Sequence, residues 1–479
     1  MANKKQEFVA HLTPRDVDFA QWYTDVILKT ELVDYAPVRG CMAIRPYGYA
    51  LWENIQRELD TRFKATGHSN VSMPMFIPES LLKKEAEHVE GFAPEVAYVT
   101  HGGSEQLTER LVVRPTSETL FSAMYSKWVQ SYRDLPMLYN QWCSVVRWEK
   151  TTRPFLRTAE FLWQEGHTCH ATAEDSKAET EKMLAVYKDM SKNALAMPVI
   201  AGRKSDKEKF AGAEATYSIE AMMQDGKALQ SGTSHNFGDR FAKAFDITYL
   251  SKEGKLEYCH QTSWGASTRL IGGIIMVHGD ERGLVMPPRV APIQAVILPI
   301  AAHKEGVMEG ANNIYDSLKS AGIRVNLDDR EGYSAGWKFN EWEMKGVPIR
   351  IEVGPRDLEQ GVVTICRRDN FEKSTLPIDG LADAIAALLD TIHDSMFKKA
   401  SDFMQSHIKD VQNMDELKVA VQDGFARAMW CGDRACEDAI KEQTGAPTRN
   451  MPEGEKPLGD KCVCCGKPAN KVIYFAKQY

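Results

Sequence analysis

The sequence predicts three successive domains: an α+β domain built on an antiparallel sheet, an α/β domain, and a small, cysteine-bearing α/β domain. The chain has 479 residues, which is more than a single hydrophobic core usually serves. Strand-like runs flank an Asp-Gly turn in the first half, strand and helix patterns alternate after residue 286, and five of the ten cysteines lie in the last fifty residues. We expect the domains to span residues 1–285, 286–400 and 401–479.

The composition is that of an ordinary folded protein, with 43% hydrophobic and 26% charged residues and no evident repeat. The first residues include two lysines without a following apolar run, so we expect no signal peptide, no membrane anchor and a cytoplasmic location. Ten cysteines in a chain of this length do not indicate a disulfide framework. The net charge of −7 implies that any nucleic-acid binding uses local patches.

The first domain should contain a helix between Pro46 and Gly67, followed by an edge strand. Apolar residues recur there at helical spacing: Leu51, Trp52, Ile55, Leu59 and Phe63. The next stretch, SNVSMPMFIPES, alternates as a strand does, but Pro74 cannot donate a ladder hydrogen bond. We therefore expect this strand at an edge or an interface. Further on, ATYSIEAMMQ and KALQSGTSHNFG predict a hairpin closed by a two-residue turn at Asp225-Gly226.

Residues 147–168, RWEKTTRPFLRTAEFLWQEGHT, place three arginines and three carboxylates among apolar residues before a histidine. Two strands joined by a loop account for the pattern, because alternate residues of a strand share a face. Arg147 and Glu149 would share a face of the first strand. Phe161, Trp163, Glu165 and His167 would share a face of the returning strand. The loop between the strands would carry Lys150, Arg153 and Arg157. The loop cations could close over a polyanion such as a triphosphate. A surface hairpin with salt bridges is the alternative.

Polar residues also gather at the ends of other expected elements. RPTSETLFSAMYSKWVQSY starts a helix at Thr116 or Ser117 with Glu118 in its first turn, although plain capping explains this too. QSGTSHNFG ends a hairpin strand, and SWGASTR puts Arg269 at the start of an apolar helix. Since ligand sites gather at element ends, these segments predict a common site.

After MPPRVAP, the runs QAVILPI, IRVNLDD, VPIRIEVG and GVVTICRRD alternate with helices, which predicts a separate α/β domain. A long helix from Leu381 to about Ile408 should lead into the third domain. There, two cysteine pairs fit a structural zinc site with four thiolate ligands. The expected ligands are Cys431, Cys436, Cys462 and either Cys465, by C-x-x-C spacing, or Cys464, by C-x-C spacing. Buried cysteines without a metal are the alternative.

Together these stretches resemble the three signature motifs of class II aminoacyl-tRNA synthetases, and the whole chain resembles the prolyl-tRNA synthetase family. GHSNVSMPMFIP is similar to motif 1, the family's dimer interface, RWE…RTAEF to motif 2 and GASTRLIGG to motif 3. RPTSET, NQW, FLWQEGHT and GVPIRIEVGPRD are more specific than the general class pattern. The resemblance implies a magnesium-dependent homodimer that activates L-proline with ATP to prolyl-adenylate and transfers it to the 3'-terminal adenosine of tRNA(Pro).

The resemblance also implies roles in ATP binding. Arg147 would bind the α-phosphate and stabilise charge while the proline carboxylate, already an anion, attacks without a general base. Arg157 would hold the γ-phosphate, and Phe161 and Arg269 would cover the two faces of adenine. The remaining contacts would come from Glu149, Thr158, Ser267, and, near the ribose and magnesium, Gln230 and Thr233.

Proline is a small ring with a secondary ammonium, so its pocket needs an anionic grip and a flat apolar wall. Thr116 and Glu118 resemble the family's ammonium clamp. The wall and its rim would be formed, beside Arg147, by Trp163, Glu165, His167, His235 and Ser263. The alternative for His167 and His235 is that they are core histidines bonded to the backbone. The alternative for Trp163 is that it only packs in the core.

The second domain resembles the anticodon-binding domain of class II synthetases, with GWKFNEWEMKGVPIRIEVGPRD as its hallmark. Candidates to read the guanines of a proline anticodon are Lys338, Glu341, Arg350 and Glu352, with solvated surface charge as the alternative. The third domain resembles that of archaeal and eukaryote-like prolyl enzymes. Their chains also end in tyrosine, as at Tyr479, with the carboxylate directed toward the catalytic domain.

Two other functions would account for parts of the same pattern. A class II synthetase for threonine would hold a pocket zinc, but no matching Cys/His/His set occurs in the sequence. A non-catalytic RNA-binding relative would lack motif arginines, whereas Arg147, Arg157 and Arg269 are all present.

Overall fold

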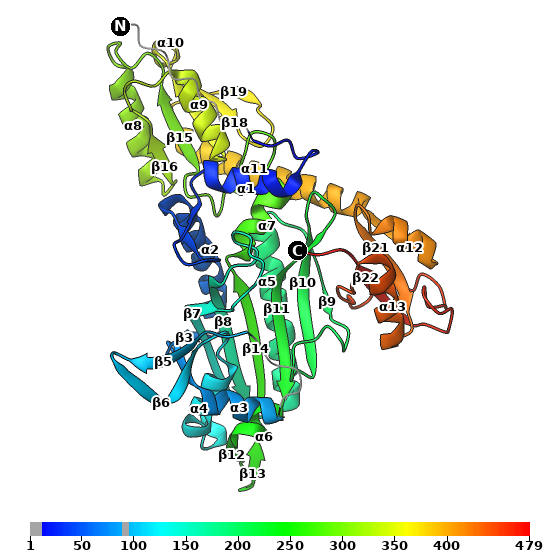
Figure 1. Cartoon of the computed structure of the whole chain (residues 1–479). Coiled ribbons are helices and arrows are strands. Elements are labelled where there is room, and N and C mark those ends of the chain that lie inside the picture. The colour runs from blue at the N-terminus through cyan, green and yellow to red at the C-terminus, as the bar shows by residue number, and fades with distance from the viewer. Residues whose placement is uncertain (1–11, 89–94) are drawn as a thin grey trace.

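The computed structural model describes residues 12–88 and 95–479, which form three parts (Figure 1). The first part holds a seven-stranded sheet, the second a five-stranded sheet, and the third a three-stranded sheet. Figure 1 shows the second part at one end of the molecule and the third part beside β9 and β10.

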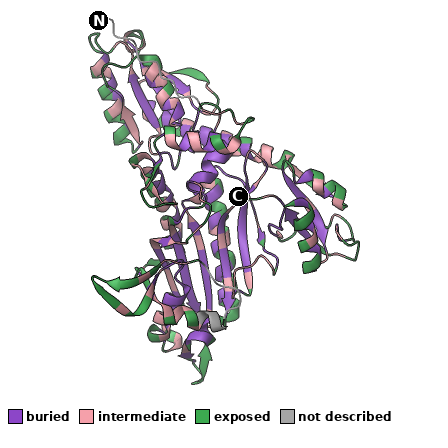
Figure 2. Cartoon of the chain, viewed as in Figure 1, coloured by how far each residue is buried: buried purple, intermediate pink, exposed green. Residues whose placement is uncertain are grey.

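The seven-stranded sheet has the order β3-β7-β8-β14-β11-β10-β9, and every pair except β3–β7 is antiparallel. Its strands are β3 (Ser69–Asn70), β7 (Met137–Val146), β8 (Glu160–His170), β9 (Val199–Arg203), β10 (Ala215–Met222), β11 (Ala228–Gly238) and β14 (His260–Ser267). The predicted antiparallel sheet is confirmed. Figure 2 shows that these strands are largely buried, because helices cover them.

Three helices, α2 (Pro46–Ala65), α5 (Ala173–Asn193) and α7 (Arg269–His278), pack their apolar residues into one core with the sheet. The predicted stripe of α2 is buried, and the Phe63 ring lies 4.8 Å from that of Trp264 on β14. A second core forms around α4 (Glu118–Trp128) and α6 (Arg240–Phe245). The remaining elements are α1 (Phe19–Lys29), β1 (Val33–Tyr35), β2 (Met42–Ile44), β4 (Phe76–Pro78), α3 (Glu79–His88), β5 (Tyr98–Gly102), β6 (Glu105–Val113), η1 (Tyr132–Asp134), β12 (Thr248–Leu250) and β13 (Leu256–Tyr258).

Two local expectations are wrong. The strand expected through Pro74 is split into β3, at the sheet edge, and β4. Between them the backbone of Met73 bonds side chains: its N–H donates to Gln141 Oε1 at 3.0 Å, and its carbonyl accepts from Arg114 Nη1 at 2.8 Å. The predicted hairpin of β10 and β11 is confirmed, but the connection between its strands has five residues, 223–227, rather than two. Gly226 sits there at φ +75°, and a Cβ would lie 2.3 Å from the backbone of Asp423 in the third part. The five-residue turn is therefore packed closely against the third part at Gly226.

The second part confirms the predicted alternation of strands and helices. Its sheet has the order β16-β15-β17-β18-β19, in which β15 runs parallel to both neighbours and the remaining pairs are antiparallel. The elements are β15 (Ala295–Pro299), α8 (Val307–Ser320), β16 (Val325–Leu327), α9 (Ala335–Met344), β17 (Ile349–Val353), α10 (Pro355–Glu359), β18 (Val362–Arg367) and β19 (Lys373–Pro377). The long helix α11 (Leu381–Ser406) crosses the division expected at residue 400.

The third part packs two helices on a sheet of order β20-β21-β22. Its elements are β20 (Ile408–Val411), α12 (Met414–Ala420), β21 (Phe425–Trp430), α13 (Arg434–Thr444) and β22 (Lys471–Phe475). The chain end returns to the first part, where the backbone N–H of Tyr479 donates to the carbonyl of Ala228 and its hydroxyl donates to Asp225 Oδ2 at 2.6 Å. Within the ranges described above, no helix combines the length and apolar character needed to cross a bilayer.

Candidate active site

A cavity of about 230 Å³ opens on the seven-stranded sheet, where β8, β11 and β14 pass the start of α4 and of α7. Most of the predicted site residues line it: Thr116 and Glu118 at α4, Arg147 after β7, Phe161, Trp163, Glu165 and His167 on β8, Gln230, Thr233 and His235 on β11, Ser263 and Ser267 on β14, and Arg269 at α7. The alternation predicted for β8 therefore points one row of side chains into the cavity.

Three predicted residues lie beside the cavity rather than in it. Glu149 and Arg157 line an adjoining pocket that shares Arg147, and Thr158 lines another that shares Phe161. The hydroxyl of Thr158 donates to the carbonyl of Glu160 at 2.7 Å. The pocket of Glu149 and Arg157 is polar, whereas the pocket of Thr158 is lined mainly by apolar side chains such as Met42, Ile44 and Leu162.

One end of the cavity is acidic. Glu165 Oε1 accepts hydrogen bonds from Ser117 Oγ at 2.5 Å and Gln141 Nε2 at 2.7 Å, while Oε2 lies 2.9 Å from His167 Nε2. Burial alone would raise the pKa of Glu165, but these hydrogen bonds, that of His167 foremost, lower the pKa to about 2. Glu165 is therefore an ionised carboxylate whose oxygens are already bonded within the protein.

Glu118 differs from Glu165 because its partners are two hydroxyl groups. Thr116 Oγ1 donates to Glu118 Oε2 at 2.6 Å, and Ser263 Oγ donates to Oε1 at 3.2 Å. A carboxylate has about four acceptor positions, so Glu118 keeps capacity for a cationic donor in the cavity. No cysteine is among the described residues that line the cavity.

His235 forms part of the wall at the same end. Its Nδ1 lies 2.9 Å from Thr216 Oγ1, and its ring centroid lies 4.8 Å from that of Phe210. Burial, and then the nearby charge of Lys204, lower the pKa of His235 to about 3, so the imidazole is neutral at neutral pH. The wall therefore presents an uncharged, flat ring.

The other end of the cavity is cationic, and Arg147 lies between it and the carboxylates, interacting with Glu118 and Glu165 on one side and with Arg269 on the other. Arg147 Nε donates to the carbonyl of Pro115 at 3.1 Å, and its guanidinium lies 5.5 Å from the ring of Phe161. Burial lowers the pKa of Arg147. Burial, together with the charges of Arg147 and Arg157, lowers the pKa of Arg269 to about 10. Arg147 and Arg269 line the cavity and the exposed Arg157 lies in the adjoining pocket, so together they form a cationic surface suited to a polyanion.

The segment between β9 and β10 supplies lining residues that the sequence did not reveal. Lys204, Glu208 and Phe210 face the cavity, and Thr216 begins the following wall. The stretch RKSDKEKF has neither helical nor strand periodicity, so it suggests a polar surface loop. The loop lines the cavity only because the folded chain packs it against the sheet.

The four predicted anticodon residues are bonded within the second part. Lys338 and Arg350 are buried; Lys338 Nζ donates to the carbonyl of Asp328 at 2.9 Å, and Arg350 pairs with Glu343 and Glu352. Glu341 pairs with Arg330, and Glu352 also pairs with Lys373.

Beside these charges lies an aromatic group that the sequence did not reveal. The rings of Tyr333, which is 40% exposed, and Trp337 have centroids 4.1 Å apart. The guanidinium of Arg330 lies 5.3 Å and 5.5 Å from them. This group offers a partly exposed stacking surface.

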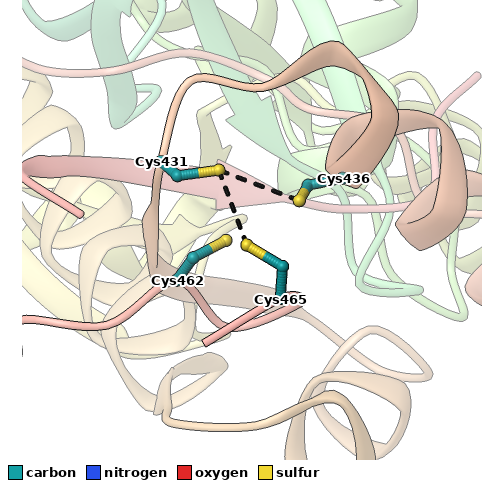
Figure 3. A group of neighbouring side chains, drawn as sticks. All are labelled: Cys431, Cys436, Cys462 and Cys465. Atoms are coloured by element: carbon teal, nitrogen blue, oxygen red, sulfur yellow. Dashed lines mark hydrogen bonds between the residues drawn. The ribbon is translucent and has the colours of Figure 1, made fainter. Parts of the chain in front are cut away.

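Four cysteine thiols converge in the third part (Figure 3). The sulfur atoms of Cys431, Cys436, Cys462 and Cys465 all lie within 4.8 Å of one another, whereas Cys464 is outside the group. Burial would raise the pKa of Cys462, but backbone N–H groups and its cysteine neighbours lower the pKa to about 7. Four thiols, one of them readily ionised, fit the tetrahedral thiolate coordination that zinc prefers.

Comparisons with known proteins agree on one family. Residues 98–278 match the family model "tRNA synthetase class II core domain (G, H, P, S and T)", residues 294–388 match "Anticodon binding domain", and residues 414–479 match "Prolyl-tRNA synthetase, C-terminal". The chain is 62% identical to a proline--tRNA ligase of Acetoanaerobium sticklandii and 61% identical to proline--tRNA ligase 2 of Clostridioides difficile, each over the full length of both chains.

A solved structure is also similar. It is the prolyl-tRNA synthetase from Cryptosporidium parvum complexed with halofuginone and AMPPNP, with a TM-score of 0.95 and 41% identity. The alignment covers 99% of this chain and 100% of that chain.

Proposed function

The chain belongs to the prolyl-tRNA synthetase family of class II aminoacyl-tRNA synthetases, and from this premise we propose how its residues perform the reaction. The enzyme activates L-proline with ATP to prolyl-adenylate and transfers the prolyl group to the terminal adenosine of tRNA(Pro). The observation that carries the residue assignment is one cavity with a carboxylate end and a guanidinium end, which matches an amino acid joined to a polyphosphate.

Proline binds at the acidic end. Glu118, with Thr116 beside it, accepts hydrogen bonds from the secondary ammonium, and Glu165 and His167 hold the surrounding polar frame. Further wall residues are Trp163, His235 and Ser263. Because Glu165 has its oxygens bonded to Ser117, Gln141 and His167, Glu118 is the stronger candidate for the charged contact.

ATP binds at the cationic end. Arg147 lies between the two ends, so it contacts the α-phosphate and the proline carboxylate, and stabilises the charge that gathers on the phosphorus oxygens as the carboxylate attacks. Arg157 takes the γ-phosphate, and Phe161 and Arg269 enclose adenine. The other contacts are Glu149, Thr158, Gln230, Thr233 and Ser267. The carboxylate is already a nucleophilic anion, so positioning and charge stabilisation account for the step.

Two metals are part of the proposal. Mg²⁺ accompanies ATP, and the oxygen atoms of Gln230 and Thr233 are hard donors of the type that Mg²⁺ accepts. Zn²⁺ would be held by Cys431, Cys436, Cys462 and Cys465, where it supplies structural cross-linking rather than chemistry.

The enzyme acts as a homodimer in the cytoplasm, with the Pro74 region, similar to motif 1, at the interface. Exposed apolar side chains there, Met75 and Phe76, support this assignment. A monomeric mass in solution would contradict it.

The proposed activity predicts that pyrophosphate exchange into ATP depends on proline when all twenty amino acids are compared. Proline should support exchange far better than threonine, because the cavity carries a carboxylate clamp and no cysteine among its described residues. Exchange with threonine alone, or with no amino acid, would refute the assignment. Retained tRNA binding without any exchange would instead favour a non-catalytic relative.

The second part binds the anticodon, with Lys338, Glu341, Arg350 and Glu352 in the recognition region. Since these four charges are bonded to one another or to neighbours, we propose that stacking on Tyr333 and Trp337 contributes to recognition. Tyr333→Ala should raise the KM for tRNA(Pro) in aminoacylation about tenfold, which corresponds to about 1.4 kcal/mol. Proline-dependent exchange without tRNA should not change. The control is Tyr315→Ala, on α8 of the same domain, and equal losses in both variants would argue against the stacking role.

A further inference from the structure

The third part touches the active-site wall through buried polar groups. The segment of residues 204–214 has its inner side on the cavity, where Lys204, Glu208 and Phe210 line it. Its outer side meets α13 and the residues that follow α13. Arg203 and Met451 exchange two backbone hydrogen bonds, of 3.0 Å and 2.7 Å. The segment is therefore clamped between the cavity and the third part.

Glu437 of α13 is the centre of this contact. Its side chain is buried, and Oε1 accepts hydrogen bonds from Thr448 Oγ1 and, at 2.8 Å, from Ser205 Oγ. Ser205 Oγ also accepts a hydrogen bond from the backbone N–H of Glu208 at 3.2 Å. Because Ser205 donates its hydrogen to Glu437, a lone pair of its hydroxyl oxygen is left to accept from the N–H of Glu208. Glu437 thereby fixes the turn at residues 205–208.

This turn continues into the wall of the proline end. The backbone N–H of Phe210 donates to Thr216 Oγ1 at 2.9 Å, and the same hydroxyl lies 2.9 Å from His235 Nδ1. The ring of Phe210 packs at 4.8 Å from that of His235. A continuous series of contacts therefore joins Glu437 to the imidazole on the wall.

We propose that Glu437 is a positioning residue for proline binding, acting through Ser205 and residues 205–210 on the wall formed by Phe210 and His235. The inference rests on the proposed function, which assigns that wall to proline. Ordering a loop costs conformational entropy, and a loop that is ordered before the ligand arrives spares this cost at binding. Glu437 itself makes no contact with the cavity and is not a catalytic residue.

Other contacts keep the third part docked when Glu437 is changed. Arg449 Nη2 pairs with Glu220 Oε2 at 2.7 Å, and both side chains are buried. Asn450 Nδ2 donates to the carbonyl of Ile200 at 2.9 Å. A substitution at Glu437 should therefore loosen the 205–210 turn without releasing the domain.

The test compares Glu437→Gln, Ser205→Ala and the double variant in pyrophosphate exchange with the full-length enzyme. Ser205→Ala should raise the KM for proline about tenfold, since it removes the hydrogen bond to Glu437, and Glu437→Gln should raise it severalfold, since the amide oxygen still accepts but more weakly. The KM for ATP and kcat should stay within about twofold. The double variant should be no worse than Ser205→Ala, because that change alone already removes the link. Calorimetric binding of proline should weaken by the same factor.

The matched control is Asp410→Asn, which removes an ion pair with Arg427 inside the third part and away from the turn. It should leave both KM values unchanged. An unchanged KM for proline in Glu437→Gln, parallel rises for both substrates, or additive effects in the double variant would overturn the inference. If Glu437→Gln does not fold, Ser205→Ala alone decides. Absence of proline-dependent exchange in the unmodified enzyme would refute the proposed function instead.

Discussion

Replacing Arg147 with alanine is expected to lower proline-dependent pyrophosphate exchange by at least about a hundredfold. Arg147 is the cation placed between the carboxylate end and the guanidinium end of the cavity. It is held by Pro115 and by the rings of Phe161 and Trp163, so its geometry exists before substrate binds. The loss should appear mainly in kcat, because charge develops at the α-phosphate in the transition state.

Folding should survive this substitution. Burial disfavours the Arg147 cation and its charge disfavours that of Arg269, whereas the carboxylates of Glu118, Glu165 and Glu149 favour the Arg147 cation, so its removal has opposing effects on stability. The thermal midpoint of Arg147→Ala is therefore expected to stay close to that of the parent. Arg147→Lys should recover only a small part of the activity, because an ammonium lacks the planar, bidentate guanidinium fork.

Arg133→Ala is the control, since Arg133 is an exposed arginine in η1, outside the cavity lining. It should leave exchange unchanged. Binding of tRNA(Pro) by Arg147→Ala should remain, because the proposed anticodon contacts lie in the second part. Near-normal exchange in Arg147→Ala would contradict the assigned role.

The second large effect is expected from the cysteine group. Cys465→Ala should abolish stoichiometric zinc, measured by elemental analysis of the purified protein, and lower the thermal midpoint. Structural zinc sites contribute free energies of roughly 10 kcal/mol or more in small domains, so losing one of four thiolates should unfold part of the third domain. Because that domain holds the 205–210 turn through Glu437, proline binding should weaken as well.

Cys464→Ala provides a matched control one residue away. Cys464 is outside the group whose four sulfur atoms lie within 4.8 Å, so this variant should keep its zinc and its thermal midpoint. Metal retained in Cys465→Ala and lost in Cys464→Ala would reverse the assignment. Absence of metal from the unmodified protein would refute the zinc proposal altogether.

Several features could be predicted because they depend on neighbours in the chain. The apolar stripe of α2 needs only helical spacing, and the row from Phe161 to His167 needs only the two-residue repeat of a strand. The start of α7 at Arg269 follows from polar residues before an apolar run. Ligand-binding residues at such element ends could therefore be predicted from the sequence.

Other features could not be predicted in this way. Glu118 is assigned to the ammonium clamp and Glu165 to the pocket rim only through the family resemblance. Packing supplies the physical reason for the difference, because it surrounds Glu165 with Ser117, Gln141 and His167. The burial of Lys338 and Arg350, two charges expected to face RNA, likewise depends on partners such as Asp328 and Glu343.

The sequence by itself determined that an antiparallel-sheet domain is followed by an α/β domain and a cysteine-bearing domain, the family, and the residue types available for charge and thiolate chemistry. The tertiary structure alone decided which residues meet: Cys465 rather than Cys464 in the sulfur group, a five-residue turn at Gly226, and the contact between Glu437 and Ser205, 232 positions apart. The physical reason is the distance along the chain over which each interaction acts. Periodicity and capping act over a few residues, whereas burial and hydrogen bonding across domains depend on where the folded chain returns to itself.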